Sequence, residues 1–345
     1  MVDYNKKIID KYKGKDVIEY SLINNKGTKI AVLNFAGILS EFSVIDNKKR
    51  VQLLLKPEKF EDFVNNSTYL NHVIARTGGR IKNATFKLNG KQIKLAANEN
   101  GNTLHGGPNS FAKNFFDVKV DKNNSQIILT KKLSEKDDSY PGSLTLKVVY
   151  TLTKNNEIKI SFKGTQEGED GVFNPTLHSY FNLANDNKTD ITGHNLWVNS
   201  DKHLEVDNEK NPTGKFINNS GPFNLKEHSN LNNVLHELEK STKEKGFDDT
   251  FIVNHKDQNP IAVLKDNNSG RQISVYSKRN ALVVYSSDGM EKNIKFNHGL
   301  SHPWIAMALE AQTAPNSENV PNLGNVTIKK GETKTYTIEY KYNKS

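Results

Sequence analysis

The feature that most constrains the fold is a two-residue alternation of apolar and polar side chains, which recurs along the whole chain. The clearest runs cover residues 144–153, 158–162, 271–276, 281–285 and 335–340. Successive side chains of a β-strand point to opposite faces of its sheet, so such a run is typical of a strand with one buried and one solvated face. The pattern predicts antiparallel sheets from end to end.

The segments between these runs support the same fold class. Asn89-Gly90 separates residues 85–88 from residues 92–95, and both residue types tolerate the positive φ angles of a two-residue hairpin turn. Helical patterns are few and short, at Glu58–Val64 and Asn230–Leu238. We find no Pro/Ser-rich linker and no repeat. The prediction is an all-β chain, a large antiparallel β-sandwich forming a single domain over residues 1–345; two smaller sandwiches are also compatible with this length.

The composition excludes several classes of site and location. Cysteine is absent, which rules out disulfides, a thiolate nucleophile and a cysteine zinc site. The longest apolar stretch, residues 31–39, is too short to span a bilayer and is interrupted by Asn34. The first residues, 1–7, lead into no apolar run, so no signal peptide is expected. We therefore expect a cytoplasmic protein without a membrane partner.

The net charge of +9 raises the question of a nucleic-acid partner. The lysines are scattered, and stretches such as residues 240–245 mix them with Glu and Ser as a solvated surface does. Clustering rather than total charge marks a nucleic-acid site, so no such partner is expected. No His, Asp and Glu residues show metal-ligand spacing, and no cofactor-binding loop is recognisable; we predict neither a metal nor a cofactor.

Two residues remote in the sequence are candidates for acid–base chemistry. His178 lies in an aromatic, strand-forming run, residues 176–183, and Glu310 follows the apolar run 304–309. The ordinary interpretation of His178 is a core histidine with satisfied hydrogen bonds. A carboxylate at the end of an apolar strand is usually at the surface or functional, because burial without a partner is costly. Together the two would form a His/Glu pair able to move protons on a small substrate.

Several short segments carry a more specific signal. In chain order they are Arg76–Ile81, Asn102–Gly107, Tyr140–Leu144, Pro175–Leu183, Gly246–Phe251 and Leu309–Gln312 followed by Asn319–Asn322. The patterns Leu-His-Gly-Gly, Tyr-Pro-Gly-x-Leu, His-Ser-Tyr-Phe-Asn-Leu and Leu-Glu-x-Gln, in this order and at these spacings, resemble the aldose 1-epimerase family, also called galactose mutarotases. The resemblance runs from about Arg76 to Asn322.

The resemblance implies a large β-sandwich with a sugar site on an open concave face. It also implies roles for six residues: His178 as the acid, Glu310 as the base, Arg80, His105 and Asp248 as ligands of the sugar hydroxyls, and Tyr180 as part of the pocket lining. Simpler interpretations stay open for some of them. Arg80 could be a surface arginine, His105 could cap a turn beside its two glycines, and Asp248 with Asp249 could form a solvated loop.

The activity that the resemblance implies is the interconversion of α and β anomers of a free aldose such as galactose or glucose. A base takes the proton of the C1 hydroxyl while an acid protonates the ring oxygen, the C1–O5 bond breaks, and closure on the other carbonyl face gives the other anomer. An ionised glutamate and a protonated histidine suit these two tasks, and positioned acid–base groups are each worth about 10²–10⁴ in rate.

Three alternatives and two departures complete the interpretation. The chain could be a non-catalytic sugar-binding protein on the same fold, or an epimerase that prefers a disaccharide such as maltose; a hexose 6-phosphate fits less well because no basic motif is assigned to a phosphate.

Gly79 stands where many family members carry Asn, and Val283 where some carry a substrate-contacting Gln. These departures put the preferred sugar in doubt. The oligomeric state is open between a monomer and a homodimer.

Overall fold

The computed structural model describes residues 2–184, 189–227, 229–255 and 259–345. Antiparallel β-sheets dominate it, and the largest described sheet has eight strands in the order β11 (Asp117–Asp121), β12 (Gln126–Ser134), β13 (Ser143–Leu152), β14 (Glu157–Glu167), β29 (Thr333–Lys344), β23 (Arg271–Ser277), β22 (Ala262–Asp266) and β18 (His194–Val198). The C-terminal strand β29 thus lies between β14 and β23 and joins two distant parts of the chain.

Two further sheets complete the framework among the described residues. A six-stranded sheet has the order β17 (Tyr180–Phe181), β27 (Met307–Gln312), β24 (Ala281–Tyr285), β21 (Asp248–Val253), β19 (Ser200–Val206) and β20 (Pro212–Asn218). A five-stranded sheet is a meander of β1 (Asp3–Tyr12), β2 (Lys15–Ile23), β3 (Lys29–Leu33), β4 (Leu39–Asp46) and β5 (Lys49–Gln52).

Short elements connect these sheets. Two-stranded pairs are formed by β6 (Val73–Ile74) with β16 (Thr176–Leu177), β7 (Arg80–Ile81) with β10 (Thr103–Leu104), β8 (Thr85–Leu88) with β9 (Lys91–Lys94), β15 (Gly171–Val172) with β28 (Thr327–Ile328), and β25 (Lys295–Phe296) with β26 (Gly299–Leu300). The α-helices are α1 (Glu61–Val64), α2 (Glu135–Asp138) and α3 (Leu231–Ser241), and single 3₁₀ turns cover residues 82–84, 111–113, 221–223 and 321–323. None of the helices in the described part of the chain is long and apolar enough to cross a membrane.

The all-β prediction is confirmed, and so are the individual elements on which it depended. Buried and less buried residues alternate along β13 and β14 as the sequence pattern requires. Asn89 and Gly90 form the turn between β8 and β9 with φ angles of 50° and 78°, the left-handed region that the turn needs. The predicted helical segments correspond to α1 and α3, each shifted by a few residues from the sequence pattern.

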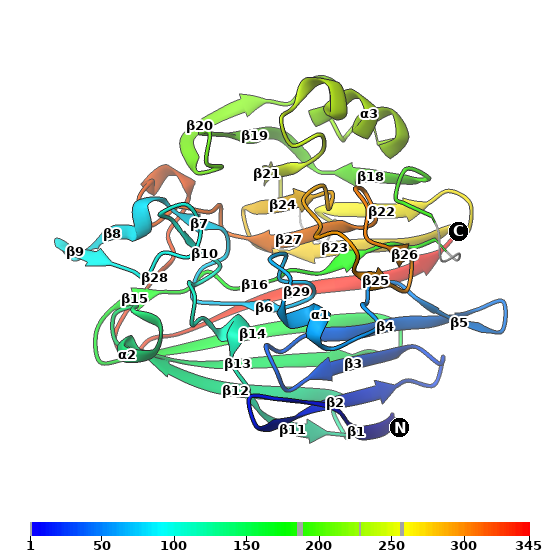
Figure 1. The fold of residues 1–345 in the computed structure, drawn as a ribbon, viewed down its shortest axis with the longest axis horizontal. Helices are drawn as coiled ribbons and strands as arrows, with labels where there is room; N and C mark the ends of the chain where they lie inside the picture. The colour runs from blue at the N-terminus through cyan, green and yellow to red at the C-terminus, as the bar shows by residue number, and fades with distance from the viewer. Residues whose placement is uncertain (1, 185–188, 228, 256–258) are drawn as a thin grey trace.

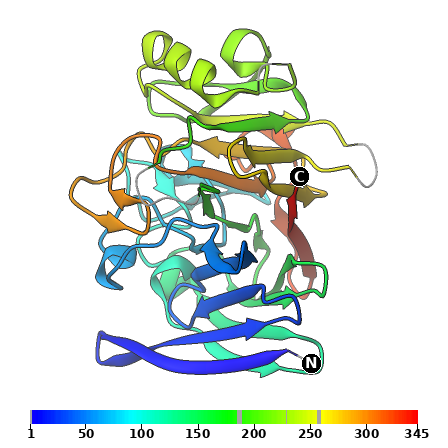
Figure 2. The ribbon, with the colours of Figure 1, turned by 90° about the vertical axis from the view of Figure 1, so that its right-hand side faces the viewer.

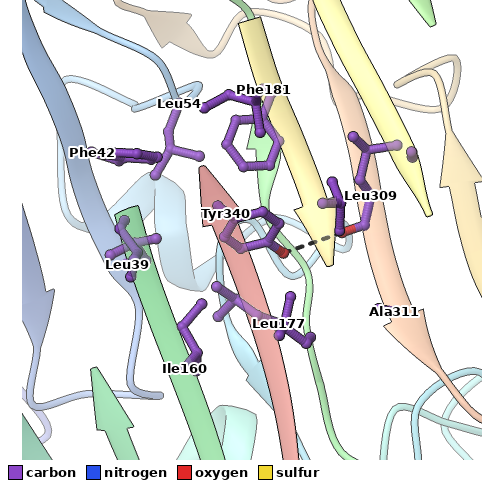
Figure 3. Packing of buried hydrophobic residues seen from close by; sticks show 14 of the residues in the cluster. Leu39, Phe42, Leu54, Ile160, Leu177, Phe181, Leu309, Ala311 and Tyr340 are labelled. Carbon is purple, nitrogen blue, oxygen red and sulfur yellow. Dashed lines mark hydrogen bonds between the residues drawn. The ribbon is translucent and has the colours of Figure 1, made fainter. Parts of the chain in front are cut away.

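The sheets stack so that their apolar faces share one core. In Figures 1 and 2 the five-stranded sheet lies toward one end of the molecule, where β11 lies beside β1, and α3 lies at the other end beside β19 and β20. The main hydrophobic cluster contains buried residues of all three large sheets. Figure 3 shows its centre, where Tyr340 of β29 lies among Leu177, Phe181 and Leu309. Phe181 and Leu309 belong to strands β17 and β27, which carry residues of the candidate site on their other face, and Leu177 directly precedes another such residue, His178.

Candidate active site

The site is a cavity of about 320 Å³ above one face of the six-stranded sheet. In the strand register, Thr250 of β21 lies opposite Val283 of β24, which lies opposite Glu310 of β27. Asp248 pairs with Tyr285 in the same way. Side chains two residues apart on a strand share a face, and all five of these residues line the cavity. The alternation of the strands therefore builds the floor of the site.

His178 reaches this floor from the short link between β16 and β17. Its backbone N–H donates to the carbonyl of His72 at 3.0 Å, and its carbonyl accepts from the N–H of Asn71 at 2.9 Å. The ring of Tyr180 stacks on the imidazole with the centroids 5.0 Å apart and the planes 11° from parallel. Held in this way, His178 Nε2 lies 3.3 Å from Glu310 Oε1. Two groups remote in the sequence meet at one wall of one cavity.

Burial controls the charge of this pair. His178 is 6% exposed and Glu310 is 2% exposed. Burial raises the pKa of Glu310 well above its ordinary value, and the nearby charge of Asp248 adds to the rise while Arg80 opposes it. Burial lowers the pKa of His178 far below its ordinary value. Both shifts favour the uncharged forms, so burial opposes the charged imidazole that the acid role of His178 requires.

Arg80, the first residue of β7, faces the cavity, and the carboxylate of Glu99 fixes the direction of its side chain. Its Nε donates to Glu99 Oε2 at 2.5 Å and its Nη2 donates to Glu99 Oε1 at 2.8 Å, a two-pronged contact that locks the guanidinium plane. Nη1 lies 4.0 Å from Asp248 Oδ2. Arg80 is therefore not a free surface arginine: it and Asp248 present a donor and an acceptor side by side on the cavity wall.

His105 lies on the same wall with its hydrogen-bonding pattern set by the backbone. It adopts a φ of 50°, and its Nδ1 accepts the N–H of Gly79 at 3.2 Å. An acceptor at Nδ1 leaves the proton of the neutral ring at Nε2. Burial, followed by the charges of His178 and Arg80, holds the pKa of His105 well below its ordinary value. His105 is thus a neutral ring with one N–H left to donate.

Gly79 cannot carry the asparagine that many family sequences have at this position. Its φ is +73°, and a Cβ added there would lie 2.5 Å from Cβ of Pro315. Asparagine tolerates this φ, but its Cβ would require a shift of Pro315. The departure seen in the sequence is built into the geometry of this loop.

A buried ion pair holds the loop that ends in Gly79 and Arg80. Arg76 donates from Nε to Asp138 Oδ2 at 2.8 Å and from Nη2 to Asp138 Oδ1 at 3.3 Å, and both side chains are fully buried. The hydroxyls of Thr77 and Tyr140 bond at 2.8 Å. The Tyr-Pro-Gly segment therefore lies outside the cavity lining and supports the loop that carries Arg80.

The structure brings all six predicted residues to one cavity, and it adds others that the sequence analysis did not select. Tyr180 is fully buried, lines the cavity and donates its hydroxyl to the carbonyl of Thr68 at 2.8 Å. Glu99, Gln312, Lys113 and Lys210 also line the cavity. Gln312 was inside a recognised pattern, and its position two residues after Glu310 on a strand was the signal that places both on one face. The sequence around Glu99 carries no pattern that indicates a role in the site, because its contact with Arg80 forms only in the folded chain.

Asp249 is not part of a solvated loop, which corrects one interpretation left open by the sequence. It lies in β21 between the cavity residues Asp248 and Thr250, does not line the cavity, and is buried. Burial raises its pKa to about 7, with Asp248 adding to the rise and Lys210 opposing it. Within the described residues, no group of three or more His, Asp or Glu residues could hold a metal ion.

The raised pKa of Asp249 predicts a pH-dependent stability. In the folded state Asp249 keeps its proton up to about pH 7. In the unfolded chain an aspartate releases its proton at about pH 3.9. The contribution of the protonated Asp249 carboxyl to the free energy of unfolding is therefore complete below about pH 4, and it is lost as the pH rises through about 7. Between pH 5 and pH 8, the free energy of unfolding of the wild type should fall by about 2–3 kcal/mol relative to that of D249N.

Urea unfolding of both proteins at pH 5 and pH 8 measures this difference. D10N, at an exposed position of β1, is the matched control and should follow the wild type at both pH values. Parallel pH dependences for the wild type and D249N would contradict a buried, protonated Asp249.

Comparisons with known proteins identify the family of the chain. The family model described as aldose 1-epimerase matches residues 19–341. The chain is 32% identical to the maltose epimerase of Levilactobacillus brevis, with 96% of each chain covered, and 33% identical to the aldose 1-epimerase of Streptococcus thermophilus, with 97% of each covered. Its fold is similar to the crystal structure of galactose 1-epimerase from Lactobacillus acidophilus, with a TM-score of 0.86 at 23% identity over 100% of each chain.

Proposed function

The chain belongs to the aldose 1-epimerase family, and from this premise we propose that it interconverts the α and β anomers of free aldoses with His178 and Glu310 as the acid–base pair. The observation that carries the proposal is the 3.3 Å contact between Nε2 of His178 and Oε1 of Glu310 at the wall of one cavity. Binding alone needs no acid and base side by side. The pair therefore favours an isomerase over a non-catalytic sugar-binding protein.

The pair works as a couple that carries one proton. Burial opposes charge on both groups, which favours a proton on Glu310 in the free site. Its transfer to His178 creates the ionised base and the protonated acid without changing the total charge. Glu310 then takes the proton of the C1 hydroxyl while His178 gives its own to the ring oxygen, and the C1–O5 bond breaks to leave an open-chain aldehyde. Rotation about C1–C2 and the reverse transfers give the other anomer.

The remaining wall residues hold the sugar. Arg80 and His105 offer N–H donors and Asp248 offers acceptor oxygens, so neighbouring hydroxyls of a pyranose find complementary partners. Tyr180 supports the imidazole of His178 by stacking on it and lines the inner wall. We propose galactose and glucose as substrates. Val283 supplies no hydrogen bond at the floor, so the amide of Gln312 is a substitute partner for one hydroxyl on that side.

A polarimetric assay tests the proposed reaction. Freshly dissolved α-galactose and α-glucose should reach the equilibrium rotation faster with the protein than in buffer alone. α-Maltose belongs in the same assay, because a relative of this chain is named maltose epimerase. Binding of these sugars without any acceleration would show a sugar-binding protein instead.

Replacement of Arg80 by alanine should mainly weaken sugar binding. The variant loses hydrogen bonds from a charged donor, which are worth about 1.5–3 kcal/mol. KM should therefore rise about tenfold or more, while kcat changes much less. R50A, at an exposed arginine of β5, is the matched control and should leave both constants unchanged. Unchanged KM and kcat in R80A would remove Arg80 from the site.

We also propose that residues 1–345 act as one domain. The main core cluster combines buried residues of the five-, six- and eight-stranded sheets, which supports a single folding unit. The floor of the site belongs to the six-stranded sheet, and the strands behind it belong to the eight-stranded sheet.

A further inference from the structure

The hydroxyl of Tyr340 lies directly behind the acid–base pair, on the side away from the cavity. Tyr340 belongs to β29, where it pairs in register with Ile158 of β14 and Val275 of β23. It is fully buried, and its ring packs edge-on against Phe181 with centroids 5.0 Å apart. A buried phenol needs partners for its hydroxyl, because an unpaired polar group in the core is costly.

Both partners of this hydroxyl are immediate neighbours of the pair. The Tyr340 hydroxyl lies 2.6 Å from Oγ of Ser179, the residue after His178. It also donates to the carbonyl of Leu309, the residue before Glu310, at 3.3 Å, as Figure 3 shows. Successive side chains of an extended chain point to opposite faces, so the cavity side carries His178 and Glu310 while the core side carries their neighbours.

We propose that Tyr340 is a positioning residue, whose hydroxyl bridges Ser179 and Leu309 and thereby sets the separation of His178 from Glu310. This inference rests on the acid–base roles proposed above. Beside the bridge the two segments pair as strands, with Tyr180 opposite Ala308 and Phe181 opposite Met307. Where this pairing ends, the N–H of Leu309 donates to the carbonyl of Ser179 at 3.3 Å, a long bond. The phenol is a third point of attachment, supplied by a different sheet.

The spacing that Tyr340 sets matters because proton transfer depends steeply on geometry. A displacement of about 1 Å in a catalytic group can cost about a hundredfold in rate. Apart from the stacking of Tyr180 on the imidazole, the two side chains themselves have few other fixed contacts, since Nδ1 of His178 and Oε2 of Glu310 are buried without a hydrogen-bond partner among the described residues. Their positions therefore depend on the backbone segments that the phenol joins.

Y340F tests the proposal, because it keeps the ring and removes only the hydroxyl. We expect kcat for α-galactose to fall about tenfold, while KM stays within about twofold, since the phenol does not touch the cavity residues that hold the sugar. Y150F is the matched control. Tyr150 is also fully buried in the eight-stranded sheet and donates to a carbonyl, that of Gly37 at 2.7 Å, but it does not line the cavity or contact the pair.

The two tyrosine variants separate positioning from simple stabilisation. Y340F loses two buried hydrogen bonds and Y150F loses one, so both should lose thermal stability, but Y340F alone should lose kcat. An equal effect of both variants on kcat, or an unchanged kcat in Y340F, would overturn the proposal. A rise in KM without a fall in kcat would also overturn it.

The variant S179A tests whether Tyr340 affects kcat through its hydrogen bond to Ser179. It removes one of the two partners of the phenol, so it should lower kcat less than Y340F does, and the double variant should match Y340F alone. If the losses of kcat in S179A and Y340F multiplied in the double variant, the two residues would not act through one shared bridge. If H178N and E310Q keep their rates, the proposed function fails; if they lose their rates and Y340F does not, only the present inference fails.

Discussion

H178N and E310Q are each expected to lower the rate of mutarotation by about 10²–10⁴, the usual worth of a positioned acid or base. The two groups lie 3.3 Å apart and, in the proposed mechanism, exchange one proton, so neither can serve its partner's role after the other is lost. Their effects should therefore not multiply: the double variant should be about as slow as the slower single variant.

Both variants should stay folded. Asparagine and glutamine keep most of the volume of the replaced side chains, and Nδ1 of His178 and Oε2 of Glu310 have no hydrogen-bond partner among the described residues that the changes could break. E310Q also removes a carboxyl whose ionisation burial opposes. Thermal unfolding should show no loss of stability in E310Q, which separates a chemical effect from misfolding.

The measurement is the initial polarimetric rate minus the rate in buffer. H236N on α3 and E339Q on β29 are matched controls, because the former is exposed and the latter is a partly exposed partner of Lys159. Both should turn over at the wild-type rate. Rates near the wild type in H178N and E310Q would remove the two residues from the reaction.

D138N should destabilise the folded protein by about 3–5 kcal/mol. Arg76 and Asp138 are fully buried and joined by two hydrogen bonds. Burying two charges is costly, and removal of one leaves the other without compensation. Arg76 also donates to backbone carbonyls of the turn that contains Pro141 and Gly142, so the unpaired guanidinium would loosen this corner as well.

Chemical denaturation of D138N against E167Q tests this expectation. Glu167 pairs with Lys132 at 2.6 Å, but both side chains are about half exposed, so its loss should cost no more than about 1 kcal/mol. Equal, small losses in both variants would show that the buried pair contributes little. Because Arg76 precedes the loop of Gly79 and Arg80, residual folded D138N should also show a raised KM.

The sequence was sufficient for the parts of the fold that depend on local pattern. The alternation along β13, β14, β23 and β24 predicted strands, and Asn89-Gly90 predicted its hairpin. The order of the strands was beyond such reasoning. Nothing local in β29 indicates that it separates β14 from β23, because pairing between distant segments is decided by packing of the whole core.

The same limit applies to the site. Motifs and the family resemblance identified six residues that line one cavity. They did not reveal that Glu99 fixes Arg80, or that Tyr340 lies behind the pair, since both contacts join segments with no common pattern. They also implied a charged His178. The degree of burial, which depends on the folded structure and could not be predicted, lowers the pKa of His178 and so opposes that charge.

The central place of β29 has a consequence for the order in which the molecule assembles. The hairpins of β11–β14 can form early from neighbouring segments, as can the β22–β23 hairpin. These two halves become one sheet only when β29 docks between them, and closing such long loops slows folding. The phenol behind the acid–base pair arrives with that same strand, so a refolding chain should acquire its catalytic geometry only at the step that unites the halves.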